Sequence, residues 1–243
     1  RQRQMCIRDR INEAFRVLRT NLEFMLDAKI ENKASVTLFT SFNPGSGKSF
    51  LTMNTAATFA MKGKRILVID GDLRRGSASA YLGSQHKGLS DYLGKRESCL
   101  DALVQENPDI PGFFLLPAGT IPPNPTELLA EPLFKETIEQ LRGHYDYILI
   151  DCPPIDIVAD TQIIEKLADR TVFVVRAGLL ERDMLSELQR MYDEKRFKNM
   201  ALLLNGTEGG GNRYGYRYGY KYGYKYGYGS KNYYKSVSYT HLR

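Results

Sequence analysis

A short glycine-rich segment constrains what this chain can fold into more than any other feature. It reads Asn43-Pro-Gly-Ser-Gly-Lys48-Ser49 and lies between an apolar run at 35–41 and a helix-like segment at 50–61. Between a strand and a helix, such a turn directs backbone N–H groups toward a polyphosphate. Lys48 can reach the β- and γ-phosphates, and the Ser49 hydroxyl is placed to bind Mg²⁺. The segment therefore predicts a phosphate-binding loop for a nucleoside triphosphate.

The loop departs from the pattern G-x-x-x-x-G-K-[ST] at its first position, where Phe42 replaces glycine. The surrounding sequence compensates, because the run at 35–41 is rich in β-branched and apolar residues, as a buried parallel strand is. A chance surface turn containing Gly, Lys and Ser is the alternative. The residues expected to contact the nucleotide are Pro44, Gly45, Ser46, Gly47, Lys48, Ser49 and Phe50.

Strand-like and helix-like segments alternate along the rest of the chain. Further strands are expected at 65–70, 113–117, 145–151, 171–176 and 200–205, and helices at 128–141, 161–168 and 183–196. This rhythm predicts an α/β fold with a mostly parallel sheet and helices on both faces, as one domain over 11–208. Ligands of such sheets bind at the carboxyl ends of the strands. Asn205 ends the last strand, and its amide makes it a weaker candidate for an adenine contact.

Two of the expected strands end in carboxylates. Asp70 and Asp72 close the run at 65–70, with the basic pair Arg74 and Arg75 just behind, and Asp151 closes the run at 145–151. Carboxylates at this edge of the sheet can hold Mg²⁺ or accept the proton of an attacking hydroxyl. Taken alone, each could instead cap the helix that follows. Together with Lys48 they predict a catalytic set for phosphoryl transfer.

The carboxyl-terminal segment at 209–243 has a different composition. It holds seven Lys or Arg residues and no acid, which leaves 27 basic against 28 acidic residues before it. The net charge of +6 therefore belongs to a tail, and the folded part is nearly neutral. Because the stretch of alternating tyrosines lacks aliphatic core residues, we expect the tail to be flexible. Its candidate phosphorylation sites are Tyr214, Tyr216, Tyr218, Tyr220, Tyr222, Tyr224, Tyr226, Tyr228, Tyr233 and Tyr234.

The order P-G-x-G-K-S, I-D-x-D-L-R and I-D-x-P-P resembles the bacterial tyrosine kinases that regulate capsule and exopolysaccharide export. The resemblance extends from about residue 10 to 234 and includes Pro122-Pro-Asn-Pro-Thr-Glu-Leu-Leu129. It implies a P-loop NTPase fold of the deviant Walker type, with ATP and Mg²⁺ as cofactors and the tail as substrate. Carried over by position, Asp70 is the base, and Ser49, Asp72 and Asp151 organise the metal. Residues 1–8 and 236–243 do not continue the pattern, so we expect them to be junction artefacts, and residues 1–10 form a terminal segment outside the expected domain.

An amphipathic segment at 11–26 carries Glu13, Arg16 and Arg19 on one face. A solvated charged face is the simple interpretation. The spacing also resembles the family's E-x-x-R-x-x-R motif, which implies a ring-like homo-oligomer in which one subunit phosphorylates the tail of the next. The resemblance further implies a membrane adaptor, fused upstream or separate, a cognate tyrosine phosphatase, and a cytoplasmic location at the inner face of the membrane.

Two other functions compete with this one. A partner- or membrane-switching ATPase of the cell-division-site or partition type would share the three motifs, but it would have a lysine where this chain has Asn43 and would lack the tyrosine tail. A nucleic-acid-binding ATPase could use the basic aromatic tail as its grip. Because the tail follows a complete ATP site, we expect nucleic acid to be the less favoured partner.

Overall fold

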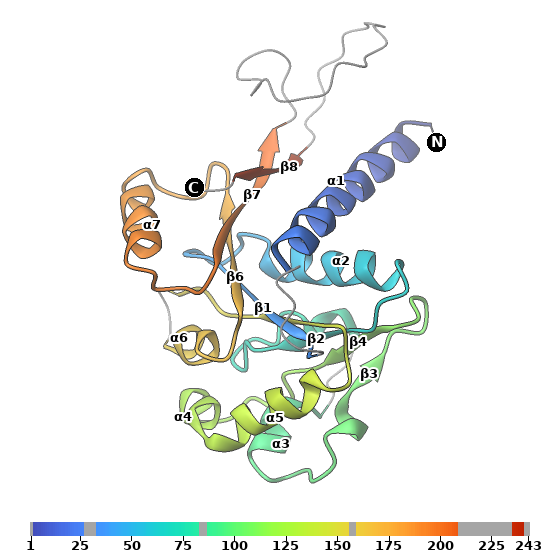
Figure 1. The fold of residues 1–243 in the computed structure, drawn as a ribbon, viewed down its shortest axis with the longest axis vertical. Coiled ribbons are helices and arrows are strands. Elements are labelled where there is room, and N and C mark those ends of the chain that lie inside the picture. Colours follow the sequence, from blue (N-terminus) through green and yellow to red (C-terminus); the bar gives the residue numbers. More distant parts are fainter. Residues whose placement is uncertain (1, 27–32, 83–86, 156–158, 209–234, 241–243) are drawn as a thin grey trace, which may run out of the picture.

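The computed structural model describes residues 2–26, 33–82, 87–155, 159–208 and 235–240. Their fold is an eight-stranded sheet with the order β3-β4-β2-β5-β1-β6-β7-β8 (Figure 1). The strands are β1 (Ser35–Thr40), β2 (Ile66–Asp70), β3 (Gln105–Glu106), β4 (Phe113–Leu116), β5 (Tyr147–Asp151), β6 (Arg170–Arg176), β7 (Met200–Glu208) and β8 (Lys235–Thr240). All six expected strands are present and pair in parallel, which confirms the mostly parallel sheet.

The two remaining strands are antiparallel and were not expected. The two-residue strand β3 pairs with β4. Strand β8 pairs with β7 and lies within 209–243, the segment for which the sequence predicts a flexible tail. Without β8, β7 would be an edge strand with unpaired backbone groups, and Val237, Tyr239 and Thr240 are residue types that favour strands. Residues 209–234, with all ten candidate tyrosines, lie outside the described residues.

Helices cover both faces of the sheet, as the sequence predicts. The α-helices are α1 (Gln2–Leu26), α2 (Lys48–Ala60), α3 (Leu89–Leu93), α4 (Pro125–Ala130), α5 (Pro132–Arg142), α6 (Asp160–Glu165) and α7 (Asp183–Asp193), with 3-10 turns η1 (Ser79–Leu82) and η2 (Asp101–Leu103). Helices α1 and α2 lie together on one face, and α3, α4 and α5 on the other (Figure 1). Helix α7 packs against Phe173 of β6.

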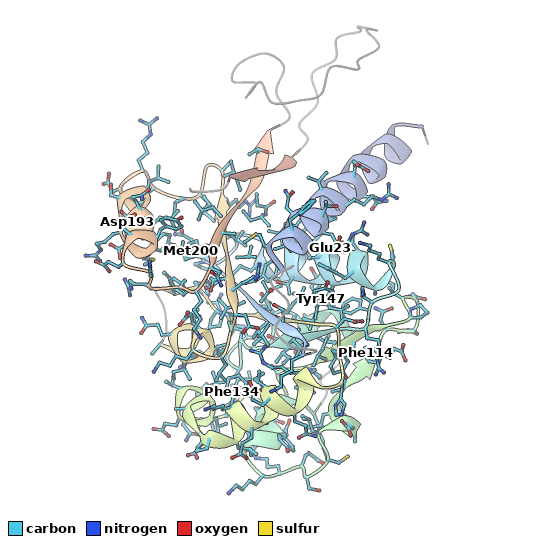
Figure 2. The ribbon with its side chains drawn as sticks, viewed as in Figure 1. Glu23, Phe114, Phe134, Tyr147, Asp193 and Met200 are labelled. Atoms are coloured by element: carbon cyan, nitrogen blue, oxygen red, sulfur yellow. The ribbon has the colours of Figure 1, made fainter. Side chains whose placement is uncertain are left out.

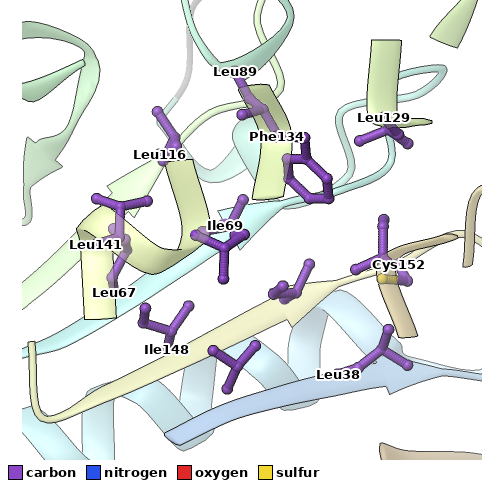
Figure 3. Close-up of a cluster of buried hydrophobic side chains, with 14 of the residues drawn as sticks. Leu38, Leu67, Ile69, Leu89, Leu116, Leu129, Phe134, Leu141, Ile148 and Cys152 are labelled. Carbon is purple, nitrogen blue, oxygen red and sulfur yellow. The ribbon is translucent and has the colours of Figure 1, made fainter. Parts of the chain in front are cut away.

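Alternation along the buried strands sends side chains to two separate cores. In β2, Ile66 and Val68 pack under α1 and α2, whereas Leu67 and Ile69 join Phe134 of α5 on the opposite face. Figure 3 shows the second core, which includes Leu67, Ile69 and Phe134. Because β2 is covered on both sides, its sequence is a continuous apolar run. Both cores hold the central strands rigidly beneath the edge where those strands end.

The single helix expected at 128–141 is wrong, because the structure has two helices there. Helix α4 ends at Ala130 and α5 begins at Pro132, with Glu131 between them in an extended conformation at φ −64° and ψ 144°. A residue that precedes proline avoids the helical region because the proline ring crowds its backbone. The break shifts the axis of α5 relative to α4 and lets α4 contact α6.

Candidate functional site

The glycine-rich segment forms a tight turn between β1 and α2. Gly45 and Gly47 have φ values of 76° and 93°, in the left-handed region. A Cβ atom at Gly47 would lie 2.4 Å from Nδ2 of Asn205, so only glycine fits there. The hydroxyls of Ser41 and Ser46 each donate a hydrogen bond to the carbonyl of Asn43, at 2.8 Å. Helix α2 then begins at Lys48, so its first backbone N–H groups face the turn.

Two later strands hold this loop from the side. Arg176, at the end of β6, donates to the carbonyl of Gly45 at 2.6 Å, and Asn205 of β7 donates to the carbonyl of Ser46 at 2.9 Å. Arg176 and Asn205 are register partners on adjacent strands. Asn205 therefore supports the loop itself, and its predicted adenine contact stays a prediction. Nothing in the sequence near Arg176 had marked it as a site residue.

Lys48 and the three predicted carboxylates meet at the carboxyl edge of the sheet. Asp70 and Asp151 are register partners on β2 and β5, and Asp70, Asp72 and Asp151 are 0%, 5% and 1% exposed. Burial lowers the pKa of Lys48, and the charges of Asp151 and Asp72 partly restore it. The structure therefore brings these four residues together within electrostatic range.

Asp70 is held by its own chain on all sides. Its carboxylate accepts hydrogen bonds from the backbone N–H and the hydroxyl of Ser79, at 2.7 and 2.6 Å, and from the backbone N–H of Asp72 at 3.2 Å. Burial raises the pKa of Asp70 to about 6, and the Ser79 hydrogen bonds limit that rise. The Ser79 hydroxyl also accepts a hydrogen bond from Ala118. No motif had identified Ser79, because this contact depends on how the turn after β2 folds back.

Asp151 carries the least satisfied oxygen of the site. Burial and the nearby charge of Asp70 raise the pKa of Asp151 to about 7, while a hydrogen bond from Ser49 and the charge of Lys48 oppose the rise. Its Oδ1 is buried without a hydrogen-bond partner. A buried oxygen with no donor, beside a serine hydroxyl, suits coordination of a hard cation.

The donor set at this edge fits Mg²⁺ bound together with a nucleotide. Among the described residues no group of three or more His, Cys, Asp or Glu side chains is arranged to hold a metal alone. Mg²⁺ commonly takes one or two protein ligands and completes its shell with phosphate oxygens and water. Ser49, Asp151 and Asp72 are available for that arrangement.

Arg74 and Arg75, the basic pair after β2, have side chains in different environments. Asp72 Oδ1 accepts from the backbone N–H groups of Arg74 and Arg75, at 3.2 and 3.1 Å. The side chain of Arg74 donates to Asp160 and to Thr126, both at 3.0 Å. Arg74 thereby ties the turn after β2 to α4 and α6. For the side chain of Arg75 the described part of the chain offers no partner.

Of the three residues predicted for an oligomer interface, two are exposed and one is largely buried. Glu13 and Arg16 pair at 3.2 Å on the surface of α1, and both side chains are 64% exposed. Arg19 instead donates to the carbonyl of Thr58 in α2 at 3.0 Å, and its side chain is only 20% exposed. Arg19 therefore holds α1 on α2 within one chain.

Two further contacts fix how α1 lies on α2. Glu23, labelled in Figure 2, accepts a hydrogen bond from Lys62 at 2.8 Å. The ring of Phe50 stands edge-on to Phe15, with their centroids 5.8 Å apart. One edge of the Phe50 ring thus contacts α1, while the residue stays 45% exposed, and its predicted nucleotide contact stays a prediction.

A cavity of about 460 Å³ lies away from the loop, and its lining includes Arg65, Phe114 and Tyr145. Arg65 precedes β2 and Tyr145 precedes β5, so this cavity opens at the amino edge of the sheet. No predicted site residue lines it. The predicted site residues and this cavity therefore lie at opposite edges of the sheet.

Comparison with known proteins agrees with a nucleotide site at the glycine-rich loop. The model of a family described as AAA domain matches residues 35–196. Tyrosine-protein kinase YwqD of Bacillus subtilis is 34% identical over 198 residues, which cover 81% of this chain and 81% of that protein. Tyrosine-protein kinase etk of Escherichia coli is 33% identical over 196 residues, or 80% of this chain but 26% of that longer protein.

Solved structures extend the likeness to three dimensions. The kinase domain of Escherichia coli ETK matches with a TM-score of 0.73 and 33% identity, over 86% of this chain and 80% of that one. The septum site-determining protein MinD of Pyrococcus horikoshii has a TM-score of 0.57 at 23% identity, over 70% of this chain and 69% of that one. At that identity the likeness to MinD concerns the fold alone.

Proposed function

The chain belongs to the family of bacterial tyrosine-protein kinases of capsule and exopolysaccharide biosynthesis, and from this premise we propose that it transfers the γ-phosphoryl group of ATP to tyrosines of its own tail, presented by a neighbouring copy. One observation carries the proposal. Lys48 and the carboxylates of Asp70, Asp72 and Asp151 meet beside a left-handed glycine turn at the carboxyl edge of the sheet.

ATP binding would use the loop and the start of α2. Backbone N–H groups from Gly45 to Ser49 surround the phosphates, and Lys48 neutralises the β- and γ-phosphates. Ser49, Asp72 and Asp151 would hold Mg²⁺, whose charge stabilises the phosphates during transfer. The unpaired Oδ1 of Asp151 supports this assignment. Arg176 and Asn205 keep the loop in shape through its carbonyls.

In the transfer step, the tyrosine oxygen forms a bond to the γ-phosphorus as the bond from that phosphorus to the β-bridging oxygen breaks. ADP leaves, and the phenolic proton passes to Asp70. With a pKa of about 6, this carboxylate is mostly ionised at neutral pH and can accept the proton. It is fully buried under Ser79. The acceptor therefore reaches Asp70 only if Ser79 moves aside.

The acceptor would be the tyrosine-rich tail of another copy. Tyrosine alternates with Gly and Lys or Arg over 214–228, and the tail starts at seven positive charges. Each phosphotyrosine adds about −1.5 to −2 charges, so several would reverse the sign of the tail. The exposed pair Glu13 and Arg16 is the part of α1 available to contact a neighbouring subunit in a ring. Release of the charge-reversed tail would then change the assembly.

The cellular setting follows from the same family. None of the helices in the described ranges is long and apolar enough to cross a bilayer. We assign the chain to the cytoplasmic face of the membrane, recruited by a membrane adaptor that is fused upstream or encoded separately. A tyrosine phosphatase would reset the tail. The greater length of the Escherichia coli relative supports a fused arrangement in part of the family.

The switching ATPase and the nucleic-acid-binding ATPase are less well supported. The likeness to MinD extends to the fold, but Asn43 stands where a lysine would be expected and the tail tyrosines would have no purpose. Nucleic-acid binding through the tail would not require a catalytic set of three carboxylates. Both alternatives predict ATP hydrolysis without phosphotyrosine.

Mass spectrometry after incubation with Mg-ATP tests the proposal directly. We expect phosphate on several tail tyrosines of the wild-type chain and none on Lys48→Met. Lys33→Met, an exposed lysine paired with Glu139, is the matched control and should behave as wild type. ADP and free phosphate without any phosphotyrosine would overturn the kinase assignment in favour of a switching ATPase.

A further inference from the structure

Two consecutive arginines follow the carboxylates of β2, and only one of them has a structural task. Arg74 donates to Asp160 and Thr126, and Asp160 is fully buried, so this guanidinium is part of the scaffold. Arg75 is exposed, and its side chain has no partner in the described ranges. An arginine without a partner at the edge of an active site is available to a ligand.

The backbone of Arg75 is nevertheless anchored at the site. Its N–H donates to Asp72 Oδ1 at 3.1 Å, and the N–H of Gly76 donates to the carbonyl of Asp72 at 2.8 Å. Gly76 has a φ of 59°, which only glycine adopts without strain, and it closes the turn tightly. The root of the Arg75 side chain is therefore fixed next to one of the proposed metal ligands, while its guanidinium can move.

The charge of Arg75 also acts on Lys48. The two side chains lie close enough for their positive charges to repel each other, at the edge of the sheet where Asp72 and Asp151 also act on Lys48. Two cations that lie close enough to repel each other are stabilised when both contact one anion. In the proposed function the phosphates of ATP lie at Lys48, so the anion that Arg75 and Lys48 can share is the terminal phosphate.

We propose that Arg75 is a catalytic residue that binds the γ-phosphoryl group of the ATP held by its own chain. The inference rests on the proposed function. As the tyrosine oxygen bonds to the γ-phosphorus and the bond to the β-bridging oxygen breaks, the guanidinium donates two hydrogen bonds to non-bridging γ-oxygens. The phenolic proton goes to Asp70, and ADP is the leaving group. A planar, permanently charged fork matches a phosphoryl group in geometry and in charge.

Nucleotide binding separates this role from a structural one. We expect Arg75→Ala to weaken binding of a non-hydrolysable ATP analogue by roughly 10-fold while leaving ADP binding unchanged, because only the analogue has a γ-phosphate. Titration with fluorescent nucleotides measures both. Arg75→Lys should restore part of the difference. Arg65→Ala, an exposed arginine at the amino edge of the sheet, is the control. Equal losses for both nucleotides, or no loss for either, would overturn the proposal.

A mixing experiment tests whether Arg75 acts within one chain. The kinase copy has its ten tail tyrosines replaced by Phe, and the acceptor copy has an intact tail with Lys48→Met. We expect Arg75→Ala in the kinase copy to slow tail phosphorylation by roughly 100-fold and the same change in the acceptor copy to have no effect. A loss caused from the acceptor copy would reject the inference. Absence of phosphotyrosine in the pair with both Arg75 residues intact would reject the proposed function instead.

Discussion

Both edges of the sheet bury charged groups, but the charges at the amino edge are paired within the chain and those at the carboxyl edge are not fully paired. At the amino edge, Arg142 is 6% exposed and donates to Asp169 at 2.6 and 3.1 Å and to the carbonyls of Ala34 and Leu167. Asp169 also accepts from the backbone of Val36 at 2.7 Å. At the carboxyl edge, Asp72 and Asp151 act on Lys48, Asp70 lies beside Asp151, and an oxygen of Asp151 has no partner.

The contrast separates a charge that supports the fold from charges held for a ligand. Arg142 and Asp169 use bonds within the chain, so their burial is compensated at folding. Asp151 keeps an oxygen without a partner, and burial raises the pKa of Asp70 to about 6 and that of Asp151 to about 7, even though Asp70 accepts hydrogen bonds from Ser79. A divalent cation and a lysine-bound polyphosphate would balance that edge. At the amino edge, Arg142 Nε also lacks a hydrogen bond, but its charge faces both Asp169 and Glu139.

The largest expected effect tests the supporting edge. Arg142→Ala leaves the partly buried Asp169 without its guanidinium and removes hydrogen bonds to two backbone carbonyls, so we expect the free energy of unfolding to fall by about 3 kcal/mol. Urea denaturation measures this change. Phosphorylation per folded molecule should stay within about twofold of wild type. Lost catalysis at unchanged stability would break the comparison.

A change of opposite sign is expected at the carboxyl edge. Asp151→Asn removes a buried carboxylate that Asp70 repels, so we expect the nucleotide-free chain to gain about 1–2 kcal/mol above pH 7. Tail phosphorylation should be abolished in the same variant. Glu136→Gln, on the exposed surface of α5, is a control for loss of one acid. A destabilised Asp151→Asn protein would show that the site is not strained.

The pH dependence of stability sharpens the same point. The pKa values of Asp70 and Asp151 are raised in the folded chain from an ordinary 3.8, so folding binds protons and stability falls as pH rises from about 4 to 7. We expect this fall to be smaller by about 1 kcal/mol or more in Asp70→Asn/Asp151→Asn than in wild type. Thermal unfolding in EDTA between about pH 4 and 8 measures it. Parallel curves for the two proteins would contradict the raised values.

The smallest effects are expected in α1, where Arg19 supports the fold and Arg16 is exposed for a partner. Arg19→Ala removes a hydrogen bond to α2 and should cost about 1 kcal/mol of stability. Arg16→Ala should change stability by less than about 0.5 kcal/mol, since its pair with Glu13 is exposed, and should weaken assembly as seen by light scattering. Reversed effects of the two substitutions would assign Arg19 to the interface and Arg16 to the fold.

Local patterns predicted most of the fold and the centre of the site. The loop and its flanking strand and helix are encoded in consecutive residues, and strands buried on both faces read as apolar runs. The break before Pro132 was also readable, because Glu131 precedes a proline. Partners distant in sequence were not readable. Three hydrogen bonds arise only when separate elements pack. They join Ser79 to Asp70, Arg19 to Thr58 and Arg176 to Gly45.

The sequence also could not predict which of two nearby arginines supports the fold and which stays exposed. Arg74 and Arg75 look alike in the chain, yet one meets a buried carboxylate of α6 and the other does not. The same holds for Arg16 and Arg19, which lie one helical turn apart. Strand β8 depends on an open neighbouring edge, which no local pattern describes.

The supports of the glycine turn come from far downstream, since Arg176 and Asn205 lie 131 and 159 residues after the carbonyls that they hold. A nascent chain emerging from the ribosome therefore contains the loop long before it contains the side chains that shape it. Competence to capture nucleotide should appear late in synthesis, once β6 and β7 have joined the sheet. Truncated products would then be unable to sequester ATP or modify other proteins.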